Sequence, residues 1–313
     1  MRVTGVQKVL IIQAGSLSKV ALSLPLIYAV ACANPEVRFT LLVKPSITAI
    51  LVDLPTNIEA MTLLNYGGKH KVRSMSRLIR LLRQQDLDAI VDVENSAYSR
   101  LLSFFTALWY STQRVTKRTI KYKREKLKQS VSLFEKKENE KQLIKRAFEK
   151  LPLNSIKEIK AISPNFEISF LQEELPAVAI KSYTVIVAPF GKSLSPTLQQ
   201  RETVCNLIQQ LLSKFPSCGL ALIVQDGEQL QDKIAGDNCA FLPCNLLFPI
   251  ELFILKKAEL VIAPESAYLY EAEMVGTEAY CLPESAPYEE GVTQSILKII
   301  SNKISQKEGV SLK

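Results

Sequence analysis

Short runs of apolar residues recur along the first part of the chain, and longer amphipathic stretches separate them. Runs of this kind cover Lys8–Gln13, Val37–Val43 and Asp88–Val93. A continuous apolar run of this length is typical of a strand that is buried on both faces in a parallel sheet. Apolar residues at helical spacing, as in Met75–Leu82, favour helices between the strands, and the first helix is expected to end near Ala33. This alternation predicts a parallel sheet with helices on both faces.

The second half of the chain repeats the alternation. We expect strands at Thr184–Ala188, Gly219–Val224, Cys239–Leu242, Glu259–Ala263 and Thr277–Leu282. We expect helices around Val204–Leu212, Pro249–Lys257, Ser266–Val275 and Gln294–Ile304, with a short one from Glu228. Two Rossmann-like halves in tandem are the simplest account of both patterns, and they place the chain in the α/β class.

The middle of the chain follows neither pattern. From Thr116 to about Lys160 the sequence is rich in lysine and shows no strand signal, so we expect helical excursions and a linker there. Pro164 and Pro176 then interrupt the chain before the second half begins. We therefore predict a first domain over 1–176, with a basic helical excursion at about 114–160, and a second domain over 177–313. The last helix is a candidate for crossing back onto the first domain.

Positive charge is concentrated in one segment. The chain has a formal net charge of +8, and Arg114–Lys128 contains eight basic residues and one acid, which gives that segment +7. Two interpretations remain open: a solvated face, or a surface for phosphates or an anionic membrane. The nearby aromatic residues, Tyr110 and Tyr122, are too few for a stacking platform, so we expect no nucleic acid partner.

The cysteine and histidine content argues against several kinds of site. None of the six cysteines forms a CxxC pair, and most lie in apolar patterns where a free thiol packs as a small hydrophobe. His70 is the single histidine, which rules out a multi-histidine metal site and argues against a serine–histidine triad. No apolar run approaches the roughly 18 residues of a membrane span, and we expect no signal peptide before Lys8. We therefore expect a cytoplasmic protein without a metal or a resident cofactor.

In sheets of this kind ligands bind beyond the carboxyl ends of the strands, so the loops there form the candidate site. The loops are 14–19, 94–100, 188–197, 225–228 and 264–270. The first one opens a helix and presents backbone N–H groups to an anion, but it has neither a dinucleotide-binding nor a P-loop pattern. Ser16 and Ser18 are candidate phosphate or acceptor ligands in this loop, or simply helix caps.

The loops of the second half carry candidate donor ligands. Lys192 follows the strand that ends at Ala188, and its cation is suited to a diphosphate leaving group. Glu228 is a candidate acceptor for ribose hydroxyls, and Glu265 with Ser266 opens a helix whose N–H groups suit a phosphate. Each has an ordinary alternative as well: a surface lysine, an acid that favours the helix dipole, or a capping residue.

Two segments together resemble a known family. Lys8–Val20, followed by Leu24–Leu26, is similar to the N-terminus of glycosyltransferase family 9, the heptosyltransferases of lipopolysaccharide core assembly. Glu259–Thr277 resembles the donor-site signature of that family, and segments 88–92, 188–190 and 226–228 fall at the expected intervals. The resemblance implies a GT-B-like architecture, in which two Rossmann-like, doubly wound domains face one another across a cleft. The C-terminal domain would bind the nucleotide sugar and the N-terminal domain the acceptor.

Several positions depart from the family pattern. Lys19 stands where the family carries the aspartate that is proposed as the catalytic base, and a charged lysine does not accept a proton. Two roles stay open for it: a position that has lost the base, or a phosphate clamp. Two carboxylates are then candidates for a relocated base: Glu94, just past a predicted strand, and Glu265. Arg100 lies on the acceptor side. In the donor signature, the family's aspartate, glycine and histidine are replaced by Glu265, Ala267 and Tyr270.

By resemblance, the expected activity is inverting, metal-independent transfer of a sugar from an ADP-heptose-like nucleotide to a lipopolysaccharide-core or related glycan. The acceptor would be an anionic glycolipid, and Arg114–Lys128 would make peripheral contact with the inner membrane surface. The alternative is a catalytically degenerate relative that acts as a nucleotide-binding, glycan-binding or assembly protein. Other α/β functions, such as a nucleotide-binding regulator, come third.

Overall fold

Unit 1, Met1–Ile162, and unit 2, Ser163–Lys313, each contain one parallel sheet. The computed structural model describes residues 6–63, 71–112, 118–121, 133–156, 158–163, 184–190, 198–224, 234, 238–282 and 290–307. The domain boundary that we predict after residue 176 falls within 164–183, which lies outside the described residues.

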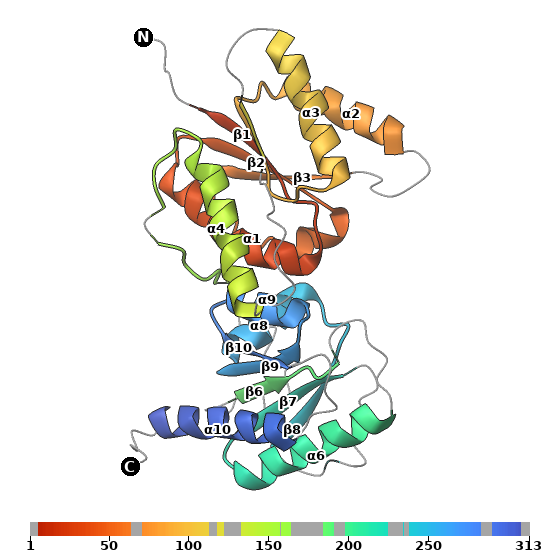
Figure 1. Cartoon of the computed structure of the whole chain (residues 1–313), viewed down its shortest axis with the longest axis vertical. Coiled ribbons are helices and arrows are strands. Elements are labelled where there is room, and N and C mark those ends of the chain that lie inside the picture. The colour runs from red at the N-terminus through yellow and green to blue at the C-terminus, as the bar shows by residue number, and fades with distance from the viewer. Residues whose placement is uncertain are drawn as a thin grey trace. The chain divides into compact units, whose positions relative to one another are not determined.

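The sheet of unit 1 has five parallel strands (Figure 1). In chain order they are β1 (Lys8–Ile12), β2 (Arg38–Val43), β3 (Ile58–Thr62), β4 (Ala89–Asp92) and β5 (Arg118–Lys121). Their spatial order is β3-β2-β1-β4-β5, which puts the apolar β1 at the centre, where both of its faces are buried. The order reverses between β1 and β4, and open sheets bind ligands at such a switch point.

Helices cover both faces of this sheet. They are α1 (Leu17–Ala33), α2 (Lys71–Gln84), α3 (Ala97–Thr112) and α4 (Leu133–Glu149), with a 3₁₀ turn η1 (Pro45–Ile50). α2 and α3 pack on the face to which Leu10 and Ile12 point, while α1 lies on the opposite face and α4 packs against α1 (Figure 1). Because α1 has the sheet on one side and α4 on another, most of its side chains are buried, which explains why it is apolar nearly all round.

Unit 2 repeats the topology of unit 1. Its parallel strands are β6 (Thr184–Val187), β7 (Gly219–Val224), β8 (Cys239–Pro243), β9 (Leu260–Pro264) and β10 (Glu278–Leu282). Their order, β10-β9-β6-β7-β8, again puts the first strand at the centre and the switch point beside it, here between β6 and β9. Both sheets match the predicted class of two Rossmann-like, doubly wound domains.

The helices of unit 2 are α6 (Leu198–Lys214), α8 (Phe248–Lys257), α9 (Ala267–Met274) and α10 (Glu290–Lys307). α6 and α10 share one hydrophobic core with the sheet, and α8 and α9 pack together on its other face (Figure 1). The side chains that α10 contributes to this core are those of Ile296, Leu297 and Ile300. The last helix therefore belongs to unit 2, in contrast to the expectation that it crosses back onto the first domain.

Two edge strands lie where the sequence pattern predicts none. β5, in the basic stretch, pairs with β4 from Ala89 opposite Arg118 to Asp92 opposite Lys121. An edge strand forms backbone hydrogen bonds to one neighbouring strand and does not require a continuous apolar run. In β5 only Thr119 and Ile120 are β-branched, and the basic residues around them remove the strand signal from the sequence. β3 is missed for a similar reason, since it is a half-exposed edge strand with mixed polarity. The predicted helical excursion is present as α4, and residues 122–132 lie outside the described part.

Two further observations bear on the expectations from composition. None of the six cysteines forms a disulfide, and Cys205 and Cys218 are buried in the core of unit 2 as packing residues. Among the residues that the structure describes, no helix has both the length and the apolar character needed to cross a membrane.

Candidate functional site

The switch point of unit 1 brings two predicted loops together at one edge of the sheet. The backbone N–H groups of Val93 and Glu94 both donate to the carbonyl of Ile12, at 3.0 and 3.2 Å, where β1 ends. On the other side of β1, the N–H of Gln13 donates to Leu42 at 2.9 Å. Glu94 and the loop that leads to Lys19 are therefore neighbours, as the sequence predicts from the topology of a parallel sheet.

The loop between β1 and α1 is built around a buried glutamine. Gln13 is 2% exposed, and its amide nitrogen donates to the carbonyl of Lys19 at 3.1 Å and to the hydroxyl of Ser23 at 2.7 Å. The amide oxygen of Gln13 is buried and has no hydrogen-bond partner among the described residues. Gln13 is not among the predicted site residues, because a glutamine at the end of an apolar run has no distinctive spacing.

Gly15 is closely surrounded by the side chains of Lys19 and Gln13. A Cβ at this position would lie 3.2 Å from Cδ of Lys19 and 3.3 Å from the amide oxygen of Gln13. The aliphatic part of Lys19 therefore lies over Gly15, in the first turn of α1. Ser16 occupies the N-cap position, as predicted, but its side chain makes no capping hydrogen bond. Ser18 is half-buried and is the second residue of the helix.

A buried carboxylate orders the loop that carries Glu94. Asp92, at the end of β4, is fully buried and accepts hydrogen bonds from the N–H of Asn95 and the hydroxyl of Ser99, both at 2.9 Å. Asn95 has a positive φ of 54°, a conformation that asparagine tolerates. Ser96 then caps α3, since its hydroxyl accepts the N–H of Ser99 at 3.1 Å. Asp92 therefore fixes the backbone on both sides of the candidate base.

Arg100, the predicted acceptor-side residue, lies on the first turn of α3. It is exposed, and its Nε donates to the carbonyl of Ser96 at 3.3 Å. Unit 1 thus holds five of the predicted residues within or next to two adjacent loops. They are Ser16, Ser18, Lys19, Glu94 and Arg100.

The switch point of unit 2 has a different composition. The N–H of Ala188, just after β6, donates to Ile262 of β9 at 2.8 Å, so the loops that follow these two strands start side by side. After β9, Ser266 is the N-cap of α9, and its hydroxyl is buried without a partner among the described residues. Ala267 is the first residue of α9, so its N–H is one of those that a helix N-terminus leaves for a ligand.

Glu265 and Tyr270 form a pair at this helix start. The hydroxyl of Tyr270 donates to Oε1 of Glu265 at 3.1 Å, while Glu265 is exposed and Tyr270 is 9% exposed. A carboxylate beside a helix N-terminus stabilises the helix dipole and at the same time opposes an incoming anion. Lys192, which would supply the compensating charge, and Glu228 lie outside the described residues.

Behind this helix start lies a buried acidic cluster that sequence reasoning missed. Tyr268 of α9 is 1% exposed, and its hydroxyl donates to the carbonyl of Cys244 at 3.4 Å. Burial and the nearby carboxylates of Glu251 and Glu271 raise the pKa of Tyr268 well above its ordinary value. Both of these glutamates are almost fully buried, on α8 and α9. The cluster joins the two helices behind the predicted donor residues.

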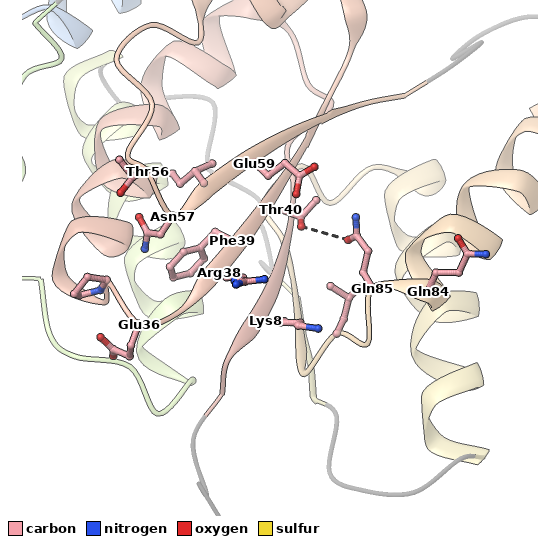
Figure 2. A pocket seen from close by; sticks show the side chains of 13 residues that line it. Lys8, Glu36, Arg38, Phe39, Thr40, Thr56, Asn57, Glu59, Gln84 and Gln85 are labelled. Atoms are coloured by element: carbon pink, nitrogen blue, oxygen red, sulfur yellow. Dashed lines mark hydrogen bonds between the residues drawn. The ribbon is translucent and has the colours of Figure 1, made fainter.

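A pocket of about 790 Å³ lies elsewhere, at the amino ends of the strands of unit 1 (Figure 2). Its lining includes Lys8, Arg38 and Glu59 from β1, β2 and β3, and Thr40, whose hydroxyl donates to Gln85 at 3.3 Å. None of the predicted site residues lines it, because they lie at the carboxyl ends of the strands. Among the described residues, no group of three or more histidine, cysteine or acidic side chains could hold a metal ion.

Two Rossmann-like units in tandem, each with candidate residues at its switch point, define a fold of the GT-B type. Several solved structures are similar to this chain. Escherichia coli ADP-heptose lipopolysaccharide heptosyltransferase II is similar with a TM-score of 0.66 and 13% identity, over 96% of this chain and 100% of that one. A glycosyl transferase of family 9 from Veillonella parvula has a TM-score of 0.63 and 11% identity, over 99% and 91%. The E. coli heptosyltransferase WaaC with ADP-2-deoxy-2-fluoro heptose is similar with a TM-score of 0.59 and 13% identity, over 95% of this chain and 100% of that one.

The resemblance to glycosyltransferase family 9 is thereby confirmed at the level of fold. No protein-family model matches the sequence, and no curated protein matches it. The likeness is one of architecture along nearly the whole chain, with little identity of sequence. What the chain does with this architecture depends on its own residues at the two switch points.

Proposed function

We propose that this protein is an inverting glycosyltransferase that takes an ADP-heptose-like nucleotide sugar and extends a lipopolysaccharide-core or related glycan. The observation that supports this most is the full-length likeness to a heptosyltransferase, over 96% of this chain and 100% of that chain. A similarity of both domains, including their order, is a stronger argument than that of one Rossmann-like domain, which hosts many functions.

Unit 2 binds the donor in this proposal. The N–H groups at the start of α9, with Ser266 and Lys192, hold the diphosphate, and Glu228 accepts the ribose hydroxyls. Tyr270 holds Glu265 by a hydrogen bond of 3.1 Å, and this keeps the carboxylate oriented at the edge of the helix start. As the bond between the sugar and the diphosphate breaks, Lys192 and the helix N-terminus stabilise the charge that develops on the leaving oxygen.

Unit 1 binds the acceptor and supplies the base. Glu94 accepts the proton of the acceptor hydroxyl while that oxygen attacks the anomeric carbon from the side opposite the diphosphate. The network of Asp92, Asn95 and Ser99 orders the loop that carries Glu94. Lys19 and Arg100 are cations beside this loop, and they suit the phosphates of an anionic glycolipid acceptor at the inner face of a membrane.

One observation favours a second candidate, a relative that binds nucleotide or glycan without catalysis. The family's base position holds Lys19, whose aliphatic part packs over Gly15 in the first turn of α1. A carboxylate is absent from that position, and the proposed base, Glu94, lies in a different loop. The two candidates differ in turnover and agree on ligand binding.

Calorimetric titration with ADP, UDP and GDP, and then with their sugar conjugates, tests the donor site. We expect one nucleotide to bind selectively and the Lys192→Ala variant to bind it at least tenfold more weakly, because a charged contact to the diphosphate is lost. Lys214→Ala, which removes an exposed lysine at the end of α6, is the matched control and should bind as the wild type does. If none of these nucleotides or conjugates binds, the donor-site proposal is wrong for both candidates.

A further inference from the structure

α3 carries an apolar stripe on its solvent side. Four large hydrophobic side chains recur at positions i, i+3, i+4 and i+7 of the helix, and each is between 41% and 51% exposed. They are Leu101, Phe104, Phe105 and Leu108. The opposite side of α3 is buried, with Leu102 fully enclosed in the core next to the sheet. Packing against the core accounts for the buried side of α3 and leaves the exposed apolar stripe without a role in the core.

The exposed apolar side chains of this protein are clustered rather than scattered. Seven large hydrophobic residues are exposed in the described part of the chain, and five lie on α3 and its neighbour α2, where Leu81 is 49% exposed. The rings of Phe104 and Phe105 lie edge to face with their centroids 5.5 Å apart, so they form one continuous surface. Clustered exposed apolar side chains on a folded protein mark an interaction surface, whereas single ones are ordinary.

The surroundings of this stripe are basic. α2 contains five basic residues and no acid along Lys71–Gln84, and Arg77 and Arg80 are exposed on it. Arg100, also exposed, is the one charged residue of α3 and adjoins Leu101. α3 contacts β5 as well, and β5 lies in the segment Arg114–Lys128 with its formal charge of +7. Both elements that neighbour the apolar helix therefore have basic sequences.

This combination indicates one occupant. Leucine and phenylalanine on one side of a helix, with arginine and lysine beside them, are typical of helices that lie in the interface of an anionic membrane. A second copy of the chain would fit less well, because in a symmetric dimer the same patch meets itself and the basic rims would face one another. We propose that the α2–α3 surface docks on an anionic lipid surface, with Leu101, Phe104, Phe105 and Leu108 entering the interface and Arg77, Arg80 and Arg100 contacting the headgroups.

The α2–α3 surface and the candidate site of unit 1 share one helix, α3. α3 begins directly after the loop that carries Glu94, and the stripe begins seven residues after Glu94. The helix that meets the lipid is therefore also the helix whose start is fixed by Asp92 and Ser96. The conclusion that the acceptor is lipid-linked rests on the proposed function, while membrane binding itself rests on the surface alone.

Vesicle co-sedimentation tests the proposal. The full chain is mixed with phosphatidylcholine vesicles, with and without phosphatidylglycerol, at low salt and at about 0.5 M salt, where the Debye length has shrunk to a few ångströms. We expect binding to the vesicles that contain phosphatidylglycerol, and a marked loss at high salt. The double variant Leu101→Ser/Leu108→Ser should bind at least tenfold more weakly, and Arg77→Gln/Arg80→Gln should weaken binding and reduce its salt dependence.

The matched control removes two exposed aliphatic side chains elsewhere, at Ile159 and Leu247, which are 47% and 71% exposed. Ile159→Ser/Leu247→Ser should bind vesicles as the wild type does, and thermal melting should show all of these variants folded. Equal binding of the stripe variant and the wild type would overturn the proposal. So would a dimer in sedimentation velocity that the stripe variant abolishes, which would assign the surface to a second copy.

A soluble glycan acceptor separates this proposal from the proposed function. If the stripe variant transfers sugar to a lipid-free acceptor at the wild-type rate but fails on vesicles, both proposals stand. If the wild type binds vesicles and transfers nothing to any acceptor, the membrane surface stands and the transferase proposal fails.

Discussion

The two units have the same strand order, yet the charged side chains that the structure describes at their switch points differ. In unit 1 a buried carboxylate, Asp92, orders the loop, and the accessible groups beside it include the cations Lys19 and Arg100. In unit 2 an exposed carboxylate, Glu265, lies at the helix start and is held by Tyr270. A shared topology therefore fixes where the ligand loops lie, and side chains decide which charge each loop presents to a ligand.

The largest expected effect concerns Glu94. If it is the base, Glu94→Gln should lower the rate of sugar transfer by about 10²–10⁴-fold and leave donor affinity unchanged, because the amide cannot accept the proton. Glu59→Gln, on the exposed side of β3 at the opposite end of the sheet, is the matched control. Single-turnover kinetics with saturating donor measures this. Equal rates for Glu94→Gln and Glu59→Gln would remove Glu94 from the chemistry.

Stability comes next, and two aspartates of unit 1 allow a controlled comparison. Asp92→Ala should lower the free energy of unfolding by about 3 kcal/mol, because its two donors lose a charged acceptor in a fully buried position. Asp88 also accepts two hydrogen bonds, from the N–H groups of Gln7 and Lys8, but it is half exposed. Water can replace that carboxylate, so Asp88→Ala should cost only about 1 kcal/mol. Urea denaturation measures both, and equal costs would mean that the Asp92 network does not stabilise unit 1.

Each unit contains a buried tyrosine, so we expect both units to lose stability at alkaline pH. Burial and Asp53 raise the pKa of Tyr28 in unit 1, and burial with Glu251 and Glu271 raises that of Tyr268 in unit 2. A raised pKa means that the folded state keeps its proton, so the stability gained is complete below about pH 10, the unfolded value, and falls as the pH rises above it. The expected loss is about 1.4 kcal/mol per pH unit for each group. Tyr28→Phe and Tyr268→Phe should each reduce the slope of unfolding free energy against pH, and a variant with the wild-type slope would contradict the assignment for its unit.

The smallest effect is expected at the pair of Tyr270 and Glu265 in unit 2. Tyr270→Phe removes the hydrogen bond to Glu265 and should change the unfolding free energy by less than about 1.5 kcal/mol, since water can solvate that carboxylate. The carboxylate would then be free to move at the start of α9, and we expect donor affinity to fall a few-fold. Tyr280→Phe, on half-buried Tyr280 of β10, is the control. Unchanged donor affinity in Tyr270→Phe would mean that the pair does not serve the donor site.

Most of the central strands can be predicted from the sequence because their burial on both faces leaves a continuous apolar run. Gly219–Val224 has the predicted bounds, and Lys8–Gln13 is longer than β1 by one residue. The edge strands of unit 1 cannot be predicted in this way, whereas β8 and β10, at the edges of unit 2, can. β3 and β5 each have one paired edge and mixed polarity, so their position depends on the neighbouring strand.

The location of the candidate site can be predicted from the sequence, but its side-chain hydrogen bonds cannot. The alternation of strands and helices predicts that the loops of Lys19 and Glu94 share one edge, and the backbone bonds to Ile12 confirm this. The side-chain bonds of Gln13 and Asp92 could not be predicted, because their partners are identified only when the loops take their final conformation. The buried cluster of Tyr268, Glu251 and Glu271 could not be predicted for the same reason, since these positions on α8 and α9 share no sequence pattern.

Turnover of a nucleotide sugar by the purified full chain tests the proposed transferase activity most directly. ADP-heptose and other nucleotide sugars are supplied with a lipopolysaccharide-core acceptor, and the release of nucleoside diphosphate is measured together with the anomeric configuration of the product by NMR. We expect release that depends on the acceptor, and a product whose anomeric configuration is inverted relative to the donor. Tight binding of the donor with no transfer to any core acceptor would contradict this expectation and would leave a nucleotide-binding protein with a transferase fold.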